Sequence, residues 1–319
     1  MQISLFKVPA VQNLLIRRRV ATTGSDSKRL SSNPDVITIV KGGLGNQLFI
    51  YAAGRAFAER LQANYYLDSR RGYTHDCYGR RFLLDRFPVS AAIMPEEMRV
   101  AATIKHTRHK LARSINKLLP LERRFYLAES HGIDAASFAS CRPKPKRVYL
   151  NGHWGDESFF KPYADLIHEE LRVPAPEDDR NRKLGAELKA NPQAVFIHVR
   201  RVRYISKLKA DYYKDAIDRI RAELDNPRFV VFSDDMTWAR ENFPSGLDYT
   251  WVEHNQKDEL ADLWLMSCCR HAIIANSSFS WWGAWLGPSD AGHRIIYSPD
   301  NERWPMRPAE GWRTLPFEI

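Results

Sequence analysis

The hydrophobic pattern of the chain alternates between short β-branched runs and longer segments with helical spacing. The run 36–40 (Val-Ile-Thr-Ile-Val) is followed by three closely spaced glycines and then by 47–62, where apolar residues recur three and four positions apart. This order predicts a strand, a glycine turn and a helix, with Asn46 at the helix N-cap. Further strands are expected at 64–68 and 148–151, and a basic helix at 95–119.

The second half of the chain repeats this alternation more regularly. Strands are expected at 194–199, 228–232, 249–252, 271–275 and 294–297, and helices at 211–224, 236–242, 258–268 and 280–286. Strands that alternate with helices in this way form a parallel sheet covered by helices on both faces. The proline- and charge-rich stretch 173–183 precedes this series, and we expect it to be a hinge between two domains.

The length of 319 residues is enough for two domains of ordinary size. No apolar run reaches the roughly 18–20 residues that a membrane-spanning helix needs, which excludes that class of protein. The first 35 residues place a short apolar stretch before an arginine cluster, the reverse of a secretory signal, and continue into a Ser- and Thr-rich segment. We therefore expect a flexible leader over 1–35, an α/β domain over 36–172 and a second α/β domain over 173–319.

The net charge of +10 is unevenly distributed along the chain. Residues 1–150 carry 26 Lys and Arg against 11 Asp and Glu, a net charge of +15, which leaves −5 for the rest. The region 99–147 is a candidate surface for binding a polyanion or an anionic membrane face. A solvated basic helix is the alternative interpretation. Nucleic acid is not expected, because no zinc knuckle, RNP signature or helix-turn-helix pattern accompanies the charge. The four cysteines lack Cys-x-x-Cys spacing, so no zinc site is expected.

Polar residues follow three strands of the second half at the points where those strands end. The three sets are His198, Arg200 and Arg201; Asp234 and Asp235; and Asn276, Ser277, Ser278 and Phe279. In an open parallel sheet, ligands bind beyond the carboxyl ends of the strands. Guanidinium groups and a Ser-rich helix start both bind phosphate, and carboxylates accept from a base or ribose. Together the three sets predict a nucleotide diphosphate site, although helix capping alone would explain either of the last two.

Two other features give weaker signals. The glycine turn 42–45 matches neither the dinucleotide fingerprint nor a P-loop, so a tight turn is its simplest explanation. Trp281, Trp282 and Trp285 recur at helical spacing, and we expect them to pack in the core rather than to stack on a sugar.

Six motifs occur in a fixed order between Ile37 and Tyr297. They are GGLGNQLFIYA at 42–52, YLNGHW at 149–154, HVRR at 198–201, FSDD at 232–235, DLWLMS at 262–267 and IANSSFSWWGAWL at 274–286. Together they resemble the α-1,2-fucosyltransferases of glycosyltransferase family 11. The resemblance implies a GT-B-like α/β fold, with two Rossmann-like domains whose parallel sheets face a cleft.

The resemblance also implies an activity. Such an enzyme transfers L-fucose from GDP-fucose to the 2-hydroxyl of a terminal β-galactoside in a cell-surface glycan, with inversion and without a metal or other cofactor. Its partners are then a nucleotide sugar and an oligosaccharide or lipid-linked glycan acceptor. The second domain binds the nucleotide sugar and the first lies on the acceptor side.

The matching motifs carry over specific roles. His198, Arg200 and Arg201 would hold the β-phosphate, and Arg200 would stabilise the negative charge that develops on the departing GDP. Asp234 would accept from guanine. The rest of the donor site would be Asp235, Asn276, Ser277, Ser278 and Phe279, and the acceptor and fucose side Gly43, Gly45, Asn46, Gln47 and His153. The general base stays open among His153, Asp156 and Glu157.

One segment departs from the family pattern. After the HVRR motif the family continues Gly-Asp-Tyr, whereas this chain has Val202-Arg203-Tyr204, so a carboxylate is replaced by a cation. Two alternatives follow, namely a GT-B glycosyltransferase of different sugar or linkage specificity, or a catalytically impaired homologue that binds a nucleotide sugar or glycan. We expect a cytoplasmic protein in which 99–147 makes peripheral contact with the anionic inner face of the membrane, testable by salt-sensitive binding to anionic vesicles.

Overall fold

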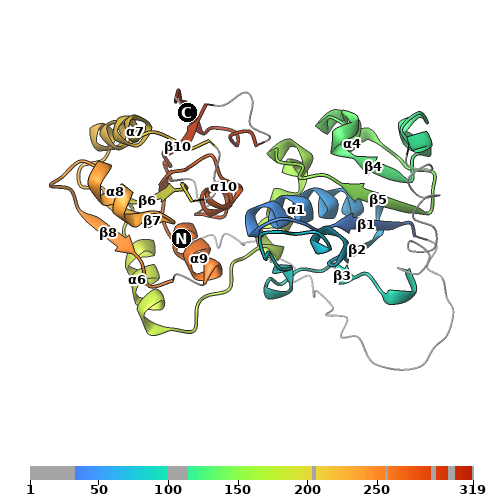
Figure 1. Cartoon of the computed structure of the whole chain (residues 1–319), viewed down its shortest axis with the longest axis horizontal. Coiled ribbons are helices and arrows are strands. Elements are labelled where there is room, and N and C mark those ends of the chain that lie inside the picture. The colour runs from blue at the N-terminus through green and yellow to red at the C-terminus, as the bar shows by residue number, and fades with distance from the viewer. Residues whose placement is uncertain are drawn as a thin grey trace, which may run out of the picture. The chain divides into compact units, whose positions relative to one another are not determined.

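Two parallel β-sheets, one from each half of the chain, form the framework of the protein (Figure 1). The structure is a computed structural model, and it describes residues 33–98, 114–202, 206–255, 258–288, 292–300 and 306–317. Nearly all of the expected leader, positions 99–113 of the basic region and positions 203–205 therefore lie outside the described residues. The membrane contact of 99–147 stays a prediction. Among the described residues, no helix is both long and apolar enough to cross a membrane.

The first sheet has the strand order β3-β2-β1-β5-β4, and its neighbouring strands are all parallel. Its strands are β1 (Asp35–Ile39), β2 (Asn64–Asp68), β3 (Ala92–Ile93), β4 (Tyr126–Ala128) and β5 (Arg147–Asn151). Its helices are α1 (Leu44–Leu61), α4 (Ala135–Ser140) and α5 (Ala164–Glu170). The predicted strand, turn and helix at the start are confirmed. The predicted basic helix 95–119 falls mostly outside the described residues.

The second sheet has the strand order β11-β10-β9-β6-β7-β8 and is also parallel between all neighbours. Its strands are β6 (Ala194–Val199), β7 (Arg228–Ser233), β8 (Tyr249–Val252), β9 (His271–Ile273), β10 (Ile296–Pro299) and β11 (Arg313–Leu315). Its helices are α6 (Asp179–Ala190), α7 (Ala210–Glu223), α8 (Met236–Asn242), α9 (Glu259–Ser267) and α10 (Ser278–Trp285). The predicted α/β alternation is confirmed, whereas β11 carries no pattern that the sequence analysis detected.

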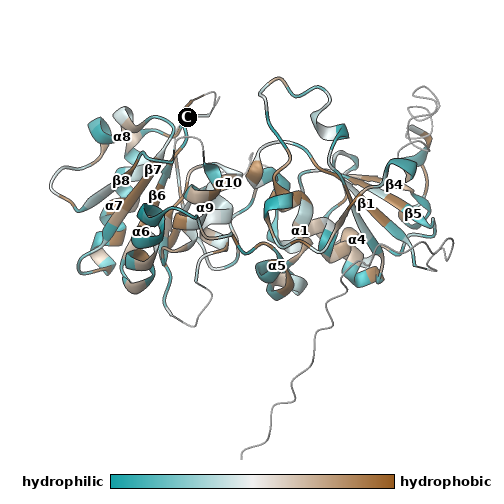
Figure 2. Cartoon of the chain, turned by 90° about the horizontal axis from the view of Figure 1, so that it is seen from below, coloured by the Kyte–Doolittle hydropathy of each residue, from teal (hydrophilic) through white to brown (hydrophobic). Residues whose placement is uncertain are grey.

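Hydrophobic residues concentrate on the strands and hydrophilic residues on outer helices such as α6 (Figure 2). The central strands β1 and β6 are buried on both faces, as in parallel sheets that helices cover, whereas the edge strand β3 is exposed. The first sheet uses residues 35–151 and the second uses 194–315. The domain boundary near residue 173 lies between these ranges and stays a prediction.

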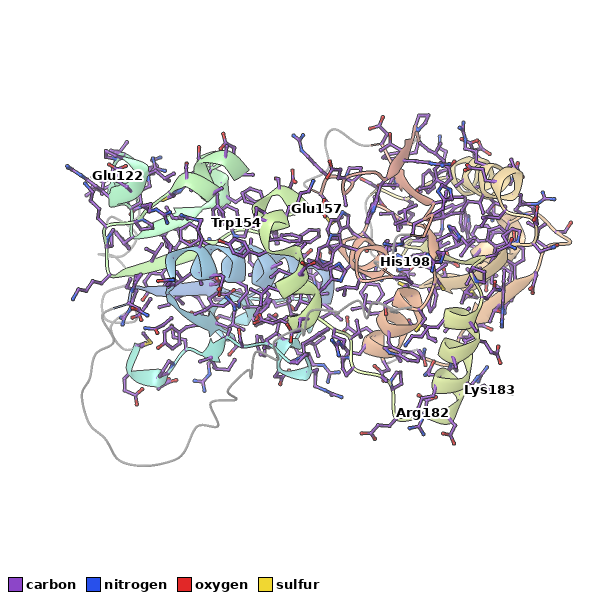
Figure 3. All side chains as sticks on the ribbon, turned by 180° about the vertical axis from the view of Figure 1, so that it is seen from behind. Glu122, Trp154, Glu157, Arg182, Lys183 and His198 are labelled. Atoms are coloured by element: carbon purple, nitrogen blue, oxygen red, sulfur yellow. The ribbon has the colours of Figure 1, made fainter. Side chains whose placement is uncertain are left out.

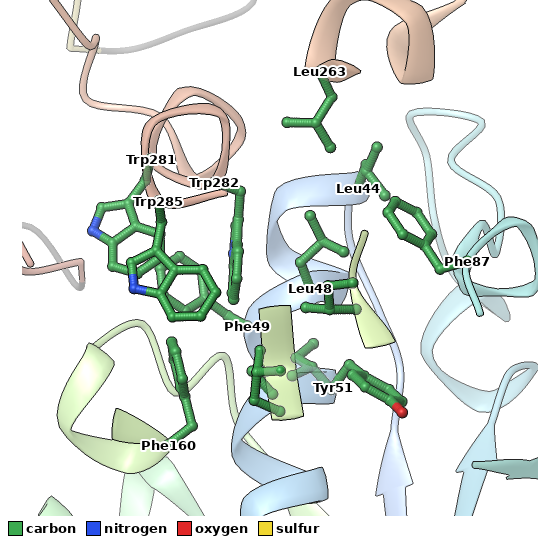
Figure 4. Packing of buried hydrophobic residues seen from close by; sticks show 14 of the residues in the cluster. Leu44, Leu48, Phe49, Tyr51, Phe87, Phe160, Leu263, Trp281, Trp282 and Trp285 are labelled. Carbon is green, nitrogen blue, oxygen red and sulfur yellow. The ribbon is translucent and has the colours of Figure 1, made fainter. Parts of the chain in front are cut away.

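Helices α1 and α10 pack against each other and join the cores of the two halves (Figure 4). The ring of Phe49 lies 4.5 Å from that of Trp281 and 5.0 Å from that of Trp282, and Phe160 stacks on Trp282 at 5.6 Å. Because Trp281, Trp282 and Trp285 are at most 6% exposed, their predicted place in the core is confirmed.

The predicted N-cap of the first helix is wrong. Helix α1 begins at Leu44 and its N-cap is Gly43, which lacks a side chain to cap with. The side chain of Asn46 instead accepts a hydrogen bond from Ser278 Oγ at 2.7 Å. The side chain of Asn46 therefore contacts the other half of the chain instead of capping α1.

Candidate active site

A cavity of about 880 Å³ lies between the carboxyl ends of the second sheet and the start of α1. Strands β6, β7 and β8 end at this cavity, as expected for the ligand side of a parallel sheet. It brings together ten of the sequence-predicted site residues, which are Gly43, Gly45, Asn46, His153, His198, Arg200, Asp234, Ser277, Ser278 and Phe279.

Arg200 is oriented at the cavity by Asp234. The carboxylate of Asp234 accepts from Arg200 Nη1 at 2.9 Å and from the backbone N–H groups of Arg201 and Val202 at 2.7 and 3.1 Å. Both of its oxygens are therefore engaged in fixing the segment that follows β6. This arrangement makes Asp234 a positioning group for Arg200 rather than the free guanine acceptor that the sequence analysis expected.

Arg201 and Asp235 lie beside the cavity without lining it. The Arg201 guanidinium lies 3.9 Å above the ring of Trp238 and donates to the carbonyl of Leu208 at 3.2 Å. Asp235 accepts from the backbone N–H of Trp238 at 3.2 Å and so caps α8. Both residues therefore stabilise the walls of the site, and Arg200 is the guanidinium of the pair that lines the cavity.

The side chains of Asn276 and Gln47 bind the backbone of neighbouring loops. Asn276 Nδ2 donates to the carbonyl of Ser206 at 2.8 Å. Gln47 is fully buried, donates to the carbonyls of Gly42 and Arg81 and accepts from the N–H of Leu83. Gln47 thus fastens the segment 81–83 to the start of α1 instead of facing a sugar.

Of the three candidate bases, His153 is the one that lines the cavity. Asp156 accepts from the N–H of Ser158 at 2.9 Å. Glu157 accepts from Trp285 Nε1 at 2.8 Å and from the N–H of Glu310 at 3.1 Å. These bonds assign the two carboxylates to holding segments of the fold together.

His153 belongs to a turn that Glu129 holds in place. The carboxylate of Glu129 accepts from the N–H groups of His153 and Trp154 at 2.6 and 3.1 Å, and Trp154 has a positive φ of 53°. A left-handed conformation of this kind costs a non-glycine residue about 1–3 kcal/mol, so the surrounding bonds must maintain it. Burial and the nearby Lys41 lower the pKa of His153, which keeps the imidazole neutral and able to accept a proton.

His198 lies near the end of β6 in the second half (Figure 3) and lines the cavity. It is 6% exposed, and burial together with Arg200 lowers its pKa to about 3. Its Nδ1 has no hydrogen-bond partner among the described residues. A neutral imidazole can donate or accept one hydrogen bond at each nitrogen but brings no positive charge to a phosphate.

The cavity also contains carboxylates that the sequence analysis did not select. Burial raises the pKa of Asp262 to about 7, partly offset by a hydrogen bond from Asn255 Nδ2 at 3.1 Å. Loss of hydration likewise raises the pKa of Glu259, against the opposing effect of Arg81 and Arg200. One feature of the sequence could have indicated Asp262. It is an acidic residue in the mostly apolar helical segment 259–267, and an acid in apolar surroundings is a candidate functional group.

A pair of buried asparagines supports Asp262. Asn255 Oδ1 accepts from Asn181 Nδ2 at 2.8 Å, and Asn255 Nδ2 donates to Asn181 Oδ1 at 3.0 Å. Asn181 Nδ2 also donates to Asp178 at 2.9 Å, at the start of α6. Because these amides bind reciprocally, the N–H of Asn255 that reaches Asp262 has a fixed direction.

The starts of α1 and α10 meet at the edge of the cavity. A Cβ atom on Gly45 would lie 2.4 Å from the backbone carbon of Ser278 and 2.5 Å from the nitrogen of Phe279. The absence of a side chain at position 45 therefore permits the approach of the two helices. Residues from the starts of both helices line the cavity.

The model of the glycosyl transferase family 11 matches residues 35–310 of the chain. The chain belongs to glycosyltransferase family 11. Within this family it is 30% identical to the alpha-1,2-colitosyltransferase of Escherichia coli over 281 residues, which cover 84% of the chain and 93% of that relative. It is also 30% identical to the O-antigen biosynthesis glycosyltransferase WbnK of Escherichia coli over 287 residues, covering 82% and 92%.

More distant similarity links this family 11 chain to animal and rhizobial enzymes. It is 28% identical to the galactoside alpha-(1,2)-fucosyltransferase 1 of Leontopithecus chrysomelas over 148 residues, which cover 43% of the chain and 40% of that relative. The crystal structure of NodZ alpha-1,6-fucosyltransferase soaked with GDP-fucose superimposes with a TM-score of 0.50 at 17% identity, covering 80% and 93% of the two chains. The predicted GT-B-like α/β fold is confirmed.

Proposed function

We propose that this glycosyltransferase moves L-fucose from GDP-fucose to the 2-hydroxyl of a terminal β-galactoside in a cell-surface glycan. The observation that carries the proposal is Arg200, held by Asp234 at a cavity that residues from the starts of α1 and α10 also line, in a chain of family 11. The names of these relatives support fucose or colitose as the transferred sugar, and the NodZ structure soaked with GDP-fucose supports a GDP-linked donor.

Transfer breaks the bond between the anomeric carbon and the β-phosphate oxygen, and the electron pair remains on that oxygen. Arg200 and the helix starts of α1 and α10 would stabilise this developing charge, because they are preorganised donors in a partly enclosed site. The acceptor oxygen forms its new bond on the opposite face of the sugar, which inverts the anomeric centre. We assign acceptance of the hydroxyl proton to the neutral imidazole of His153.

Recognition of the guanine base is assigned to Asp262. Guanine presents two N–H donors side by side on its Watson–Crick edge, and an ionised carboxylate can accept from both. Both oxygens of Asp234 already accept hydrogen bonds from the protein. Asp262 lines the same cavity, and the bond from Asn255 engages its Oδ1.

GDP affinity is expected to rise with pH between about 6 and 8, because the pKa of Asp262 is raised to about 7 and guanine binds its ionised form. Asp262→Asn should weaken GDP binding about tenfold or more and remove this pH dependence. Calorimetric titration of GDP across that range measures both effects. Asp215→Asn is the matched control, since Asp215 pairs with Arg219 on the surface of α7. An unchanged pH profile in Asp262→Asn would contradict the assignment.

A second donor, GDP-colitose, is favoured by one observation. The alpha-1,2-colitosyltransferase relative spans 84% of the chain at 30% identity, whereas the galactoside fucosyltransferase matches 43%. Colitose lacks one hydroxyl of fucose, so a site for one sugar needs few changes to accept the other. Residues 202–204, which depart from the family pattern, adjoin Arg200 in the sequence and are a place where such a change could lie.

Incubation of the purified protein with GDP-fucose or GDP-colitose and a panel of β-galactosides tests the proposal. A 2-linked fucosyl product supports it, and a product with GDP-colitose alone supports the second donor. GDP binding without any product indicates the impaired homologue, and absence of GDP binding overturns the proposal. The same assay in EDTA tests metal independence, since we expect an unchanged rate; a loss that Mg²⁺ or Mn²⁺ restores would contradict it.

A further inference from the structure

A second cavity, of about 540 Å³, adjoins the first. The two cavities share Asn255 and Glu259. The remaining walls come from the segment 81–86 in the first half of the chain and from the starts of α6 and α9 in the second. A ligand in the first cavity could therefore extend into the second without leaving the protein surface.

Three arginines line this second cavity, namely Arg81, Arg86 and Arg180. All three are exposed, and none has an ion-pair partner among the residues that the structure describes. Arg180 lies in the first turn of α6, where a cation is opposed by the helix dipole. An oxyanion bound among these guanidinium groups would accept charge-assisted hydrogen bonds from them.

Asp178, Asp258 and Glu259 also line the cavity, and among the described residues none of them forms an ion pair with the three arginines. Asp178 accepts from the backbone and side-chain N–H groups of Asn181 at 2.8 and 2.9 Å. Asp258 Oδ1 accepts from the N–H groups of Leu260 and Ala261, both at 3.1 Å. These two carboxylates cap the helix starts of α6 and α9, so their oxygens are directed to backbone N–H groups rather than to the guanidinium groups.

Arg81 is presented on a rigid support. Its carbonyl accepts from Gln47 Nε2 at 2.8 Å, and the N–H of Leu83 donates to Gln47 Oε1 at 2.9 Å. Because Gln47 is fully buried in α1, the backbone that carries Arg81 is fixed to the core. Glu259 lines both cavities. The positive charges of Arg81 and Arg200 lower its pKa, against the larger effect of burial.

We propose that the second cavity is a subsite for an oxyanionic group of the acceptor, a phosphate ester or a sugar carboxylate. The inference rests on the proposed transferase function, since it places the acceptor next to the donor cavity. Guanidinium groups bind both kinds of oxyanion through paired, charge-assisted hydrogen bonds. An acceptor that carries such a group would be bound by its charge at one cavity and react at the other.

Kinetics with matched acceptors test the subsite. A neutral β-galactoside is compared with the same galactoside bearing a phosphate ester and with one bearing a uronic acid. In the Arg81→Ala/Arg180→Ala double variant, the KM of the preferred anionic acceptor should rise about tenfold or more, while the KM values of GDP-fucose and of the neutral acceptor stay unchanged. Whether the phosphate ester or the uronic acid shows this rise identifies which of the two groups the subsite binds. Equal effects on neutral and anionic acceptors would overturn the proposal.

Arg182→Ala is the control variant. Arg182 lies on the same helix, is paired with Asp179 at 2.6 Å and does not line the cavity (Figure 3). It should leave all KM values unchanged.

A binding experiment separates failure of the subsite from failure of the transferase proposal. Inorganic pyrophosphate is titrated calorimetrically into the full chain, with and without saturating GDP. Without GDP, pyrophosphate can bind at both cavities. With saturating GDP the first cavity is occupied, and we expect one remaining binding event in the wild type and none in the Arg81→Ala/Arg180→Ala variant. Absence of that remaining event, or its persistence in the variant, overturns the subsite. Because GDP-free protein is also titrated, the result holds even if no sugar transfer is found.

Discussion

Replacement of Arg200 by alanine is expected to lower kcat for sugar transfer by about 10²–10³-fold, the usual loss when one preorganised donor to a developing charge is removed. Arg200 lines the proposed donor cavity and is oriented by a carboxylate, Asp234, at 2.9 Å. GDP affinity should fall as well, but less than kcat, because the negative charge on the β-phosphate oxygen is greatest as the bond breaks.

Two further variants sharpen this experiment. Arg200→Lys keeps the charge but loses the bidentate geometry, so its rate should lie between those of the wild type and of Arg200→Ala. Arg219→Ala is the control, since Arg219 pairs with Asp215 on the surface of α7 and lies outside the cavity. Steady-state rates with GDP-fucose as the varied substrate separate kcat from KM. An Arg200→Ala enzyme that retained full kcat would show that another group stabilises the departing GDP.

Replacement of Gly45 by alanine is expected to destabilise the protein by about 1–3 kcal/mol and to remove most of the activity. The new Cβ would lie 2.4 Å from the carbonyl carbon of Ser278 and 2.5 Å from the nitrogen of Phe279, both of them backbone atoms that cannot rotate away. The starts of α1 and α10 would therefore separate. Their separation would break the bond between Asn46 and Ser278 and enlarge the phosphate end of the cavity.

Gly43→Ala is a closely matched control for this change. It lies two positions earlier in the same turn, and a Cβ on Gly43 would meet no atom within 4 Å. Its φ of −73° is accessible to alanine. Chemical denaturation midpoints and GDP titrations of the two variants measure the difference. Equal stability and equal GDP affinity in both would show that the contact of the two helix starts is not required.

The local pattern of hydrophobic and polar residues predicted the secondary structure well, because whether a segment forms a strand or a helix depends largely on its own residues. The β-branched run of β1 and the helical spacing of α1 are both satisfied within about 20 residues of sequence. The candidate phosphate-binding side chains were selected in the same way, since residues directly after parallel strands share one edge of the sheet. His198, Arg200 and Ser277 accordingly line one cavity.

Side chains whose partners are distant in the sequence were assigned less well. Asp156 and Glu157 look accessible next to the NGHW motif, yet Glu157 is bonded to Trp285, which is 128 positions away. Asp262 was passed over as part of an apolar helix, because its pKa depends on burial and on Asn255. Neither property can be seen in a window of neighbouring residues.

The amino-acid sequence by itself determined the α/β alternation, the family motifs and the strand ends at which the donor site forms. Only the tertiary structure decided that Asp234 orients Arg200, that His153 is the candidate base in the cavity, and that Arg81 and Arg180 surround a second cavity. The physical reason is the range of the interactions. Hydrophobic periodicity and turn chemistry act between near neighbours, whereas ion pairing, burial and cavity shape depend on where the folded chain brings remote residues together.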